Sequence, residues 1–183
     1  MGNLRNKFLK KFGRAAKNED GLAAIEFAFI APVLVTMFVG TVEVTDALTC
    51  RAKVTSMSST LADLVAQDTS ISNADKTSIF NAVNAVLYPY SATGVQIRVT
   101  SIIENGSGGY KVAWSDAQNM TALTVGSAIT PPTGLVTTGG SVIKAEITYS
   151  YASTTAKLIT GGLSMTDTFY ARPRKVLIIA RTS

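Results

Sequence analysis

Reactive side chains are scarce in this 183-residue chain, and their types limit the chemistry open to it. It has no histidine and one cysteine, Cys50, so the commonest general base and the usual zinc-binding sets are missing. Asp63 and Asp68 are five residues apart, a spacing that puts them on different faces of a helix. No nucleophile elbow, P-loop or dinucleotide fingerprint occurs. We therefore predict that the protein is not an enzyme and has neither metal nor cofactor.

One acidic residue, Glu26, lies within a long apolar run, where its charge would be costly in a membrane. Glu26 is the single acidic residue in the apolar run 22–42, and it follows Gly21 by five positions. As a helix, this run would cover about 31 Å, enough to cross a hydrocarbon core of about 30 Å. Eleven of its residues are Leu, Ile, Phe or Val, each favouring insertion by roughly 0.3–0.6 kcal/mol, against about 2.5–3.5 kcal/mol for a carboxylate at the centre. The balance predicts a transmembrane helix, and Glu26 near its start becomes a candidate functional residue.

The charges on either side of this run predict its orientation. Residues 1–20 carry six basic and two acidic residues, whereas the far side begins with Glu43 and Asp46. Basic flanks stay in the cytoplasm, so the N-terminus is expected inside and the bulk of the chain outside. Six basic minus two acidic residues gives the leader +4 of the net charge of +5. The remainder is nearly neutral, so we do not expect nucleic acid as a partner.

The junction before the apolar run carries a family resemblance. An ordinary signal peptide is disfavoured, because the run is too long and no clear small-residue cleavage site follows. Gly21-Leu22-Ala23-Ala24-Ile25-Glu26-Phe27 resembles the type IV prepilin processing motif G-x-x-x-x-E-[YF] of tight-adherence (Flp-type) pili. With Pro32, the longer run is similar to the TadE-like pseudopilins of that system. The short basic leader and Arg172-Pro173-Arg174 also suit that family.

The resemblance implies a function, a cleavage and a set of partners. A prepilin peptidase would cut between Gly21 and Leu22, Glu26 would dock subunits, and Pro32 would kink the helix. The chain would be a minor pilin or pseudopilin in the bacterial inner membrane, working with other pilins and inner-membrane assembly proteins. Two alternatives remain open: a pseudopilin of a type II-like secretion system, or an uncleaved single-pass anchor for a binding module, in which Gly21 only marks a helix start.

After the predicted span, the sequence first shows the periodicity of helices. Residues 43–67 lack glycine and proline, and an apolar face recurs at three- and four-residue spacing, with a gap at Cys50 or Arg51 (Ala47, Val54, Met57, Leu61, Leu64). Cys50 is either a small apolar residue on this helix or a bridge between two subunits. A second helix is predicted over 73–87, with Ser72 as N-cap and Pro89 ending it. Its buried face is expected to be Ile79, Val83, Val86 and Leu87.

A period of two follows, which predicts antiparallel strands over 95–103, 110–114, 141–151 and 166–172. Gly106-Ser107-Gly108-Gly109 lies between two of them and is expected to be a turn rather than a phosphate loop, because no helix N-terminus follows it. Residues 117–140 are expected to form a long loop, Gly161-Gly162 a short one, and residues 176–180 an edge strand or a tail. Helices followed by strands predict a pilin-like α+β fold. We therefore expect four parts: a leader 1–21, a span 22–42, a helical continuation 43–67 and an extracytoplasmic domain 68–183.

Overall fold

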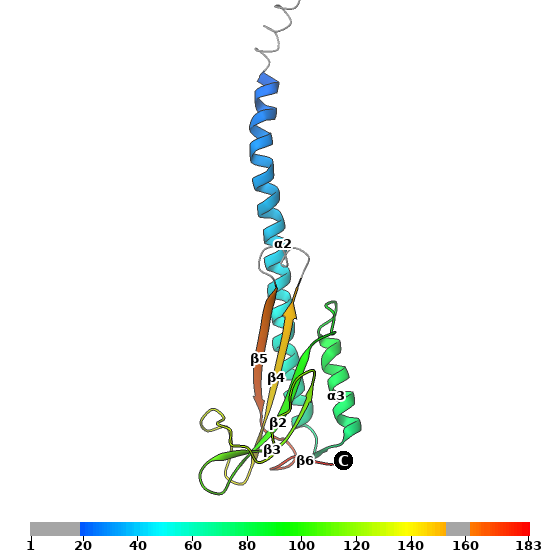
Figure 1. Cartoon of the computed structure of the whole chain (residues 1–183), viewed down its shortest axis with the longest axis vertical. Helices are drawn as coiled ribbons and strands as arrows, with labels where there is room; N and C mark the ends of the chain where they lie inside the picture. The colour runs from blue at the N-terminus through cyan, green and yellow to red at the C-terminus, as the bar shows by residue number, and fades with distance from the viewer. Residues whose placement is uncertain (1–18, 153–161) are drawn as a thin grey trace, which may run out of the picture. The chain divides into compact units, whose positions relative to one another are not determined.

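The computed structural model describes residues 19–152 and 162–183. Residues 1–18 of the predicted leader, and Gly161 of the predicted Gly161-Gly162 loop, lie outside the described residues. The chain divides into two compact units, one ending at Thr45 and the other running from Asp46 to Ser183. A long apolar helix, a second helix and an antiparallel sheet make up the fold, which confirms the α+β prediction (Figure 1).

Helix α2, Glu19–Ala66, runs through both segments that were predicted to be helical, 22–42 and 43–67. Within the second unit, Cys50 is completely buried, and so are Val54, Met57 and Leu61. Cys50 therefore occupies the gap in the predicted apolar face and makes that face continuous. The cysteine is a core residue of its own subunit, and this burial argues against the alternative of a disulfide between subunits.

Helix α3, Asn73–Val86, begins as its sequence predicts. Ser72 and Asp75 form a capping box, in which the Asp75 N–H donates to Ser72 Oγ (3.2 Å) and the Ser72 N–H donates to Asp75 Oδ2 (2.9 Å). The predicted buried face is largely confirmed, although Val86 is only half-buried and Phe80 joins the face instead (Ile79, Phe80, Val83, Leu87).

Four strands form one antiparallel sheet in the order β3-β2-β4-β5. Their bounds are Gln96–Glu104 for β2, Tyr110–Gln118 for β3, Ser141–Tyr151 for β4 and Leu163–Ala171 for β5. The prediction for β4 has the right bounds, whereas β3 is four residues longer than predicted and β5 begins three residues earlier. A shift of register between β2 and β3 at Ser101 marks a bulge.

One face of the sheet packs against the helices of the second unit, and this contact forms the core. Alternate residues of β4 point into it, as the sequence predicts (Ile143, Ala145, Ile147, Tyr149, Tyr151). The core also takes the buried faces of α2 and α3. Ile102, Val112 and Val142 are buried as well, but they lie outside this cluster. Ile102 and Val142 are even-numbered, whereas the core residues of β2 and β4 are odd-numbered, so these two belong to the other face of the sheet. Val112 pairs with Ile102 past the bulge and lies on the same face.

The long loop predicted over 117–140 begins only after Gln118 and turns back along the sheet. It bonds to the outer edge of β3, where the Gly126 N–H donates to the Val112 carbonyl (2.8 Å) and the Ile129 N–H to the Tyr110 carbonyl (3.2 Å). A single antiparallel bridge joins Lys111 to Ala128. The loop therefore covers an edge that would otherwise present unpaired backbone groups.

The R-P-R segment of the sequence serves as an attachment point within the second unit. The Arg174 N–H donates to the Ala66 carbonyl at the C-terminal end of α2 (2.9 Å), and its guanidinium bonds to Asp63 (2.8 Å). A cation at this position complements the negative end of the helix dipole. Arg172 donates from Nε to the carbonyl of Leu135 in the long loop (2.9 Å).

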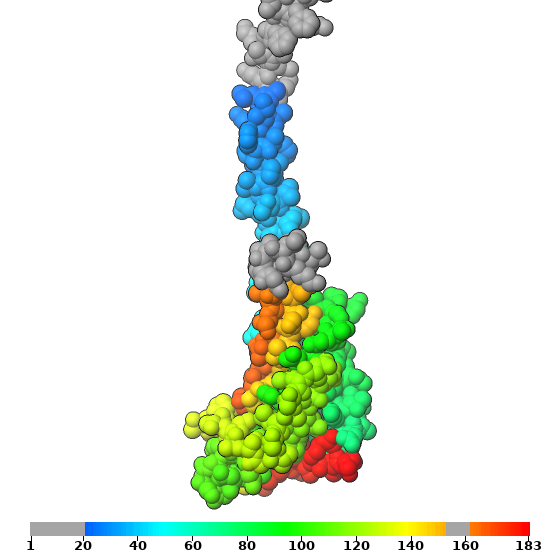
Figure 2. Space-filling model, viewed as in Figure 1, coloured from blue at the N-terminus to red at the C-terminus, as the bar shows by residue number. Residues whose placement is uncertain are grey.

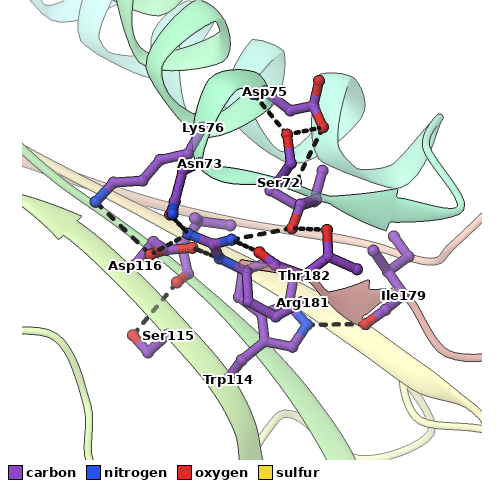
Figure 3. A network of polar contacts seen from close by, with 12 residues as sticks. Ser72, Asn73, Asp75, Lys76, Trp114, Ser115, Asp116, Ile179, Arg181 and Thr182 are labelled. Atoms are coloured by element: carbon purple, nitrogen blue, oxygen red, sulfur yellow. Dashed lines mark hydrogen bonds and ion pairs between the residues drawn. The ribbon is translucent and has the colours of Figure 1, made fainter.

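The C-terminal segment does not join the main sheet, so of the two alternatives for residues 176–180, an edge strand or a tail, the edge strand of that sheet is wrong. Strand β6, Ala180–Arg181, instead pairs in parallel with β1, Ser70–Ile71. The indole N–H of Trp114 donates to the carbonyl of the fully buried Ile179 (2.8 Å; Figure 3). These contacts close the second unit by joining its first and last strands.

Arg181 is the centre of a polar network at this closure (Figure 3). Its guanidinium bonds to Asp116 (2.7 Å), to the Ile71 carbonyl (3.1 Å) and to Asn73 (2.6 Å). Lys76 approaches the same Asp116 carboxylate at 3.7 Å. The side chains of Arg181 and Asp116 are only 21% and 13% exposed, so this pair is largely shielded from solvent.

We expect Arg181→Ala to lower the free energy of unfolding of the second unit by about 2–3 kcal/mol, because a poorly solvated carboxylate and a carbonyl lose their donor. The matched control is Arg174→Ala, whose pair with Asp63 is 58% and 46% exposed; it should cost less than about 1 kcal/mol. Urea unfolding of the full chain in detergent measures both values. Equal losses in the two variants would contradict this account.

A second charged cluster lies on the face of the sheet away from the core. Glu146 accepts from Arg98 Nε (2.7 Å) and from Lys144 Nζ (2.8 Å). Burial alone would raise the pKa of Glu146, but the hydrogen bonds and positive charges of Arg98 and Lys144 outweigh it and hold this pKa below its ordinary value.

A lowered pKa in the folded state makes stability depend on pH. The contribution of Glu146 is complete above the ordinary glutamate pKa of about 4.3 and is lost as the pH falls through the lower value of the folded state. We expect Glu146→Gln to be less stable than the wild type at neutral pH and to lose less stability on acidification. Denaturant midpoints at neutral pH and below pH 4 measure this, and parallel acid profiles for the two chains would refute it.

Candidate functional site

The residues of the predicted processing motif all lie on α2 and are open to solvent. Leu22 is 60% exposed and Phe27 is 65% exposed, and Gly21 and Glu26 are exposed as well. A Cβ added at Gly21 would meet no atom within 4 Å in the described part of the chain. Packing among the described residues therefore does not require a glycine at this position.

Gly21 is helical rather than extended, because it lies within α2. A peptidase that binds an extended chain would have to unwind α2 around Gly21. Glycine favours the helix by about 1 kcal/mol less than alanine does, which lowers the cost of unwinding at this position.

Glu26 follows Leu22 by four residues, so both lie on one face of α2, about 6 Å apart along the axis. Within residues 19–152 and 162–183, no side chain or backbone group bonds to the Glu26 carboxylate. The carboxylate is therefore available to a group from outside the described chain.

Pro32 lies inside α2, and the helix continues past it. Proline has no N–H to donate to the carbonyl four residues before it, which is the reason for expecting a kink here. The hydroxyl of Thr36 donates to the Pro32 carbonyl (2.7 Å), and those of Thr41 and Thr45 bond four residues back in the same way (2.9 Å each). These hydroxyls are satisfied inside the helix, as a lipid environment requires.

The first part of α2 has the length and composition of a membrane span. Its most apolar 18-residue window has a mean hydropathy of 2.3 and is 0% buried within the described structure. Large apolar side chains are exposed on every side of it, among them Phe29 at 77% and Phe38 at 70%. So much exposed apolar surface is unfavourable in water. The helix fits a single-pass membrane anchor.

The described residues offer little for catalysis. Among them, no group of three His, Cys, Asp or Glu side chains could hold a metal ion. Burial raises the pKa of the Cys50 thiol, an effect that the nearby charge of Lys53 only partly offsets, and this disfavours the reactive thiolate.

The structure has a polar contact between α2 and β5 that we did not predict from the sequence. Asp167 of β5 accepts from Ser58 and Thr55 (3.4 Å for Thr55) and pairs with Arg51 at 3.5 Å. Arg51 also donates to the Thr166 carbonyl (2.6 Å). The signal was present in the sequence, because Arg51, Thr55 and Ser58 recur at i, i+4 and i+7 beside the apolar face.

Comparison with known proteins supports the resemblance seen in the sequence. Residues 21–63 match the family model described as TadE-like protein. The match includes Gly21, Glu26, Pro32 and the first turns of α2 in the second unit. No curated protein and no solved structure matches the chain. Over residues 21–63, the chain is therefore similar to TadE-like proteins.

Proposed function

We propose that the chain is a minor pilin or pseudopilin that takes part in the assembly of a tight-adherence pilus. The observation that carries this proposal is the TadE-like match over residues 21–63, which covers both the apolar exposed half of α2 and the start of its packed half. A membrane anchor bearing a small α+β unit is the general plan of a pilin-like subunit. Its role is structural, since the TadE-like match, like the side chains described above, favours assembly over catalysis.

Processing is the first step of this function. A prepilin peptidase cuts between Gly21 and Leu22, on the cytoplasmic face of the inner membrane, and the apolar helix stays as the mature N-terminus. The exposure of Gly21 and the low helix propensity of glycine support this step. The test is the intact mass of the wild-type chain expressed with and without the matching peptidase. We expect a loss of residues 1–21 only with the peptidase; a full-length chain in both cells would favour the uncleaved anchor.

Assembly is the second step, and Glu26 is its docking residue. Cleavage creates a positively charged α-amine at Leu22, and the Glu26 carboxylate of one subunit meets the amine of another at membrane depth. An unpaired charge is costly there, so the pair would both stabilise the contact and set its register. The absence of a partner for Glu26 among the described residues leaves the carboxylate free for this role.

The orientation of the anchor gives a prediction that a thiol reagent can test. Residues from about 45 onward face the extracytoplasmic side, because the basic flank is N-terminal. Cys50 is fully buried and so cannot serve as the native probe. Val125, in the long loop, is 66% exposed. Val125→Cys should react with a membrane-impermeant reagent in cells with a permeable outer membrane, and the wild-type chain should not. Labelling of Val125→Cys only after lysis of the inner membrane would reverse the orientation.

A further inference from the structure

Tyrosine and leucine side chains gather at one end of the second unit. The hydroxyl of Tyr90 donates to the carbonyl of Asp46, the first residue of the unit (3.0 Å). The Tyr90 ring meets the ring of Tyr151 edge-on, with centroids 6.0 Å apart. Tyr151 pairs across the sheet with Leu163, which is 42% exposed. Tyr88, two residues before Tyr90, is 79% exposed.

Leu48 completes this end, since it follows Asp46 by two residues and is 66% exposed. We call Leu48, Tyr88, Tyr90 and Leu163 the tyrosine end. They come from α2, from the segment after α3 and from the start of β5, so three elements contribute to one end of the unit.

The opposite end of the second unit lies far from the tyrosine end. Strand β4 spans the distance, with Tyr151 at the tyrosine end and Ser141 at the other. Eleven residues of strand cover about 34 Å. Ser141 donates to the Leu177 carbonyl (2.9 Å). The C-terminal segment, red in Figure 2, lies at the lower end of the second unit.

The tyrosine end lies a short distance along the chain from the apolar span. Asp46 follows Val42 by four residues of α2, which as helix cover about 6 Å. A bilayer is about 30 Å thick in its hydrocarbon core and about 40–45 Å with headgroups, so each headgroup layer is roughly 5–8 Å deep. If the span ends at Val42, the Asp46 carbonyl, which accepts from the Tyr90 hydroxyl, lies inside the headgroup layer.

The chemistry of the tyrosine end fits that layer. Tyrosine has an apolar ring and a polar hydroxyl, and it is enriched where membranes meet water. Exposed leucines beside it can enter the outer edge of the acyl chains. Of the described charges near this end, Asp46 is exposed, Arg51 pairs with Asp167 (3.5 Å) and Lys53 donates to the Val86 carbonyl (3.4 Å). Neither sign dominates among these described residues, which suits a zwitterionic surface.

We propose that the tyrosine end rests on the lipid headgroups and holds the second unit against the membrane before assembly. This inference depends on the proposed insertion of residues 22–42, but not on cleavage or on the pilus. The argument for lipid over a protein partner is the tether: a span that ends four residues before Asp46 keeps the bilayer at a constant high local concentration.

The test places a fluorophore at each end of the unit in the full chain, reconstituted in phosphatidylcholine vesicles. Tyr88→Cys carries an environment-sensitive label, and Leu177→Cys is the matched control, because Leu177 is 70% exposed at the far end. Cys50 is fully buried, so the unsubstituted chain reports background labelling. A lipid with a nitroxide on its headgroup serves as the quencher.

We expect the label at position 88 to shift to the blue and to be quenched by the headgroup nitroxide, and the label at position 177 to show neither effect. Equal quenching at both positions, or at neither, in chains that float with the vesicles would overturn this inference alone. A blue shift at position 88 that grows with the protein-to-lipid ratio and resists the nitroxide would also overturn it, in favour of a second copy. Failure of the chain to float would overturn the anchor as well.

Discussion

Replacing Gly21 by leucine is expected to leave the whole population of the chain as a full-length precursor in the membrane. We expect the peptidase cleft to accept the glycine backbone closely, so that a branched side chain next to the cut would clash. The substitution meets no described atom, so the folded unit should be unchanged. Leucine also favours insertion, so the precursor should still reach the membrane.

The control for this experiment is Gly40→Leu on the same helix, where an added Cβ also meets nothing within 4 Å. That variant should be cut as the wild type is. Intact mass of both membrane-extracted proteins, from cells with the matching peptidase, distinguishes the two results. A Gly21→Leu chain without residues 1–21 would show that the glycine is not part of a cleavage site.

Glu26→Gln is expected to abolish co-assembly with partner pilins while leaving insertion and cleavage wholly or largely intact. Glutamine keeps the size of the side chain but removes the charge that would pair with the α-amine of another subunit. Insertion should even become easier, because a carboxylate inside the span costs about 2.5–3.5 kcal/mol at the centre and less near the end.

Crosslinking of the mature chain to its pilin partners, together with a pilus count, measures this effect. Glu43→Gln provides the same substitution just past residue 42, outside the predicted span, and should assemble normally. If the Glu26→Gln chain is cleaved, still binds those partners and supports normal pili, then Glu26 is not a docking residue.

Local sequence patterns predicted correctly those helices and strands whose signal lies within the element itself. The alternation over 141–151 predicted β4 with its bounds, because every second residue enters the core. Ser72 predicted the start of α3, because an N-cap bonds only to its neighbours in sequence. The TadE-like motif was also recognisable from a short stretch, and the family match confirms it over residues 21–63.

Contacts between distant segments could not be predicted in this way. The parallel pair of β1 and β6 joins Ser70 to Ala180, and two-residue strands have no periodicity to detect. The second half of β3 is polar, and it is a strand because β2 pairs with it as far as Gln118. Cys50 looked like a gap in an apolar stripe, because its burial depends on the sheet that covers α2.

In the candidate site, too, the features within one element were predictable from the sequence, and the contacts between distant segments were not. Gly21, Leu22 and Glu26 are placed by one helix, so their spacing alone predicts their geometry. In the proposed function, their roles would depend on a peptidase and on other subunits, which lie outside this chain. The polar contact of Asp167 with α2 was partly predictable. The stripe of Arg51, Thr55 and Ser58 on α2 can be seen in the sequence, but its partner on β5 cannot.

The most direct test of the proposed function is a pilus count in cells that lack this protein. Deletion of its gene, with the peptidase and the other pilins intact, should remove tight-adherence pili from the surface. The wild-type chain should restore them, and Gly21→Leu and Glu26→Gln should not. Normal pili in the deletion strain would contradict our account, and a loss of protein secretion in the same strain would indicate the type II-like alternative.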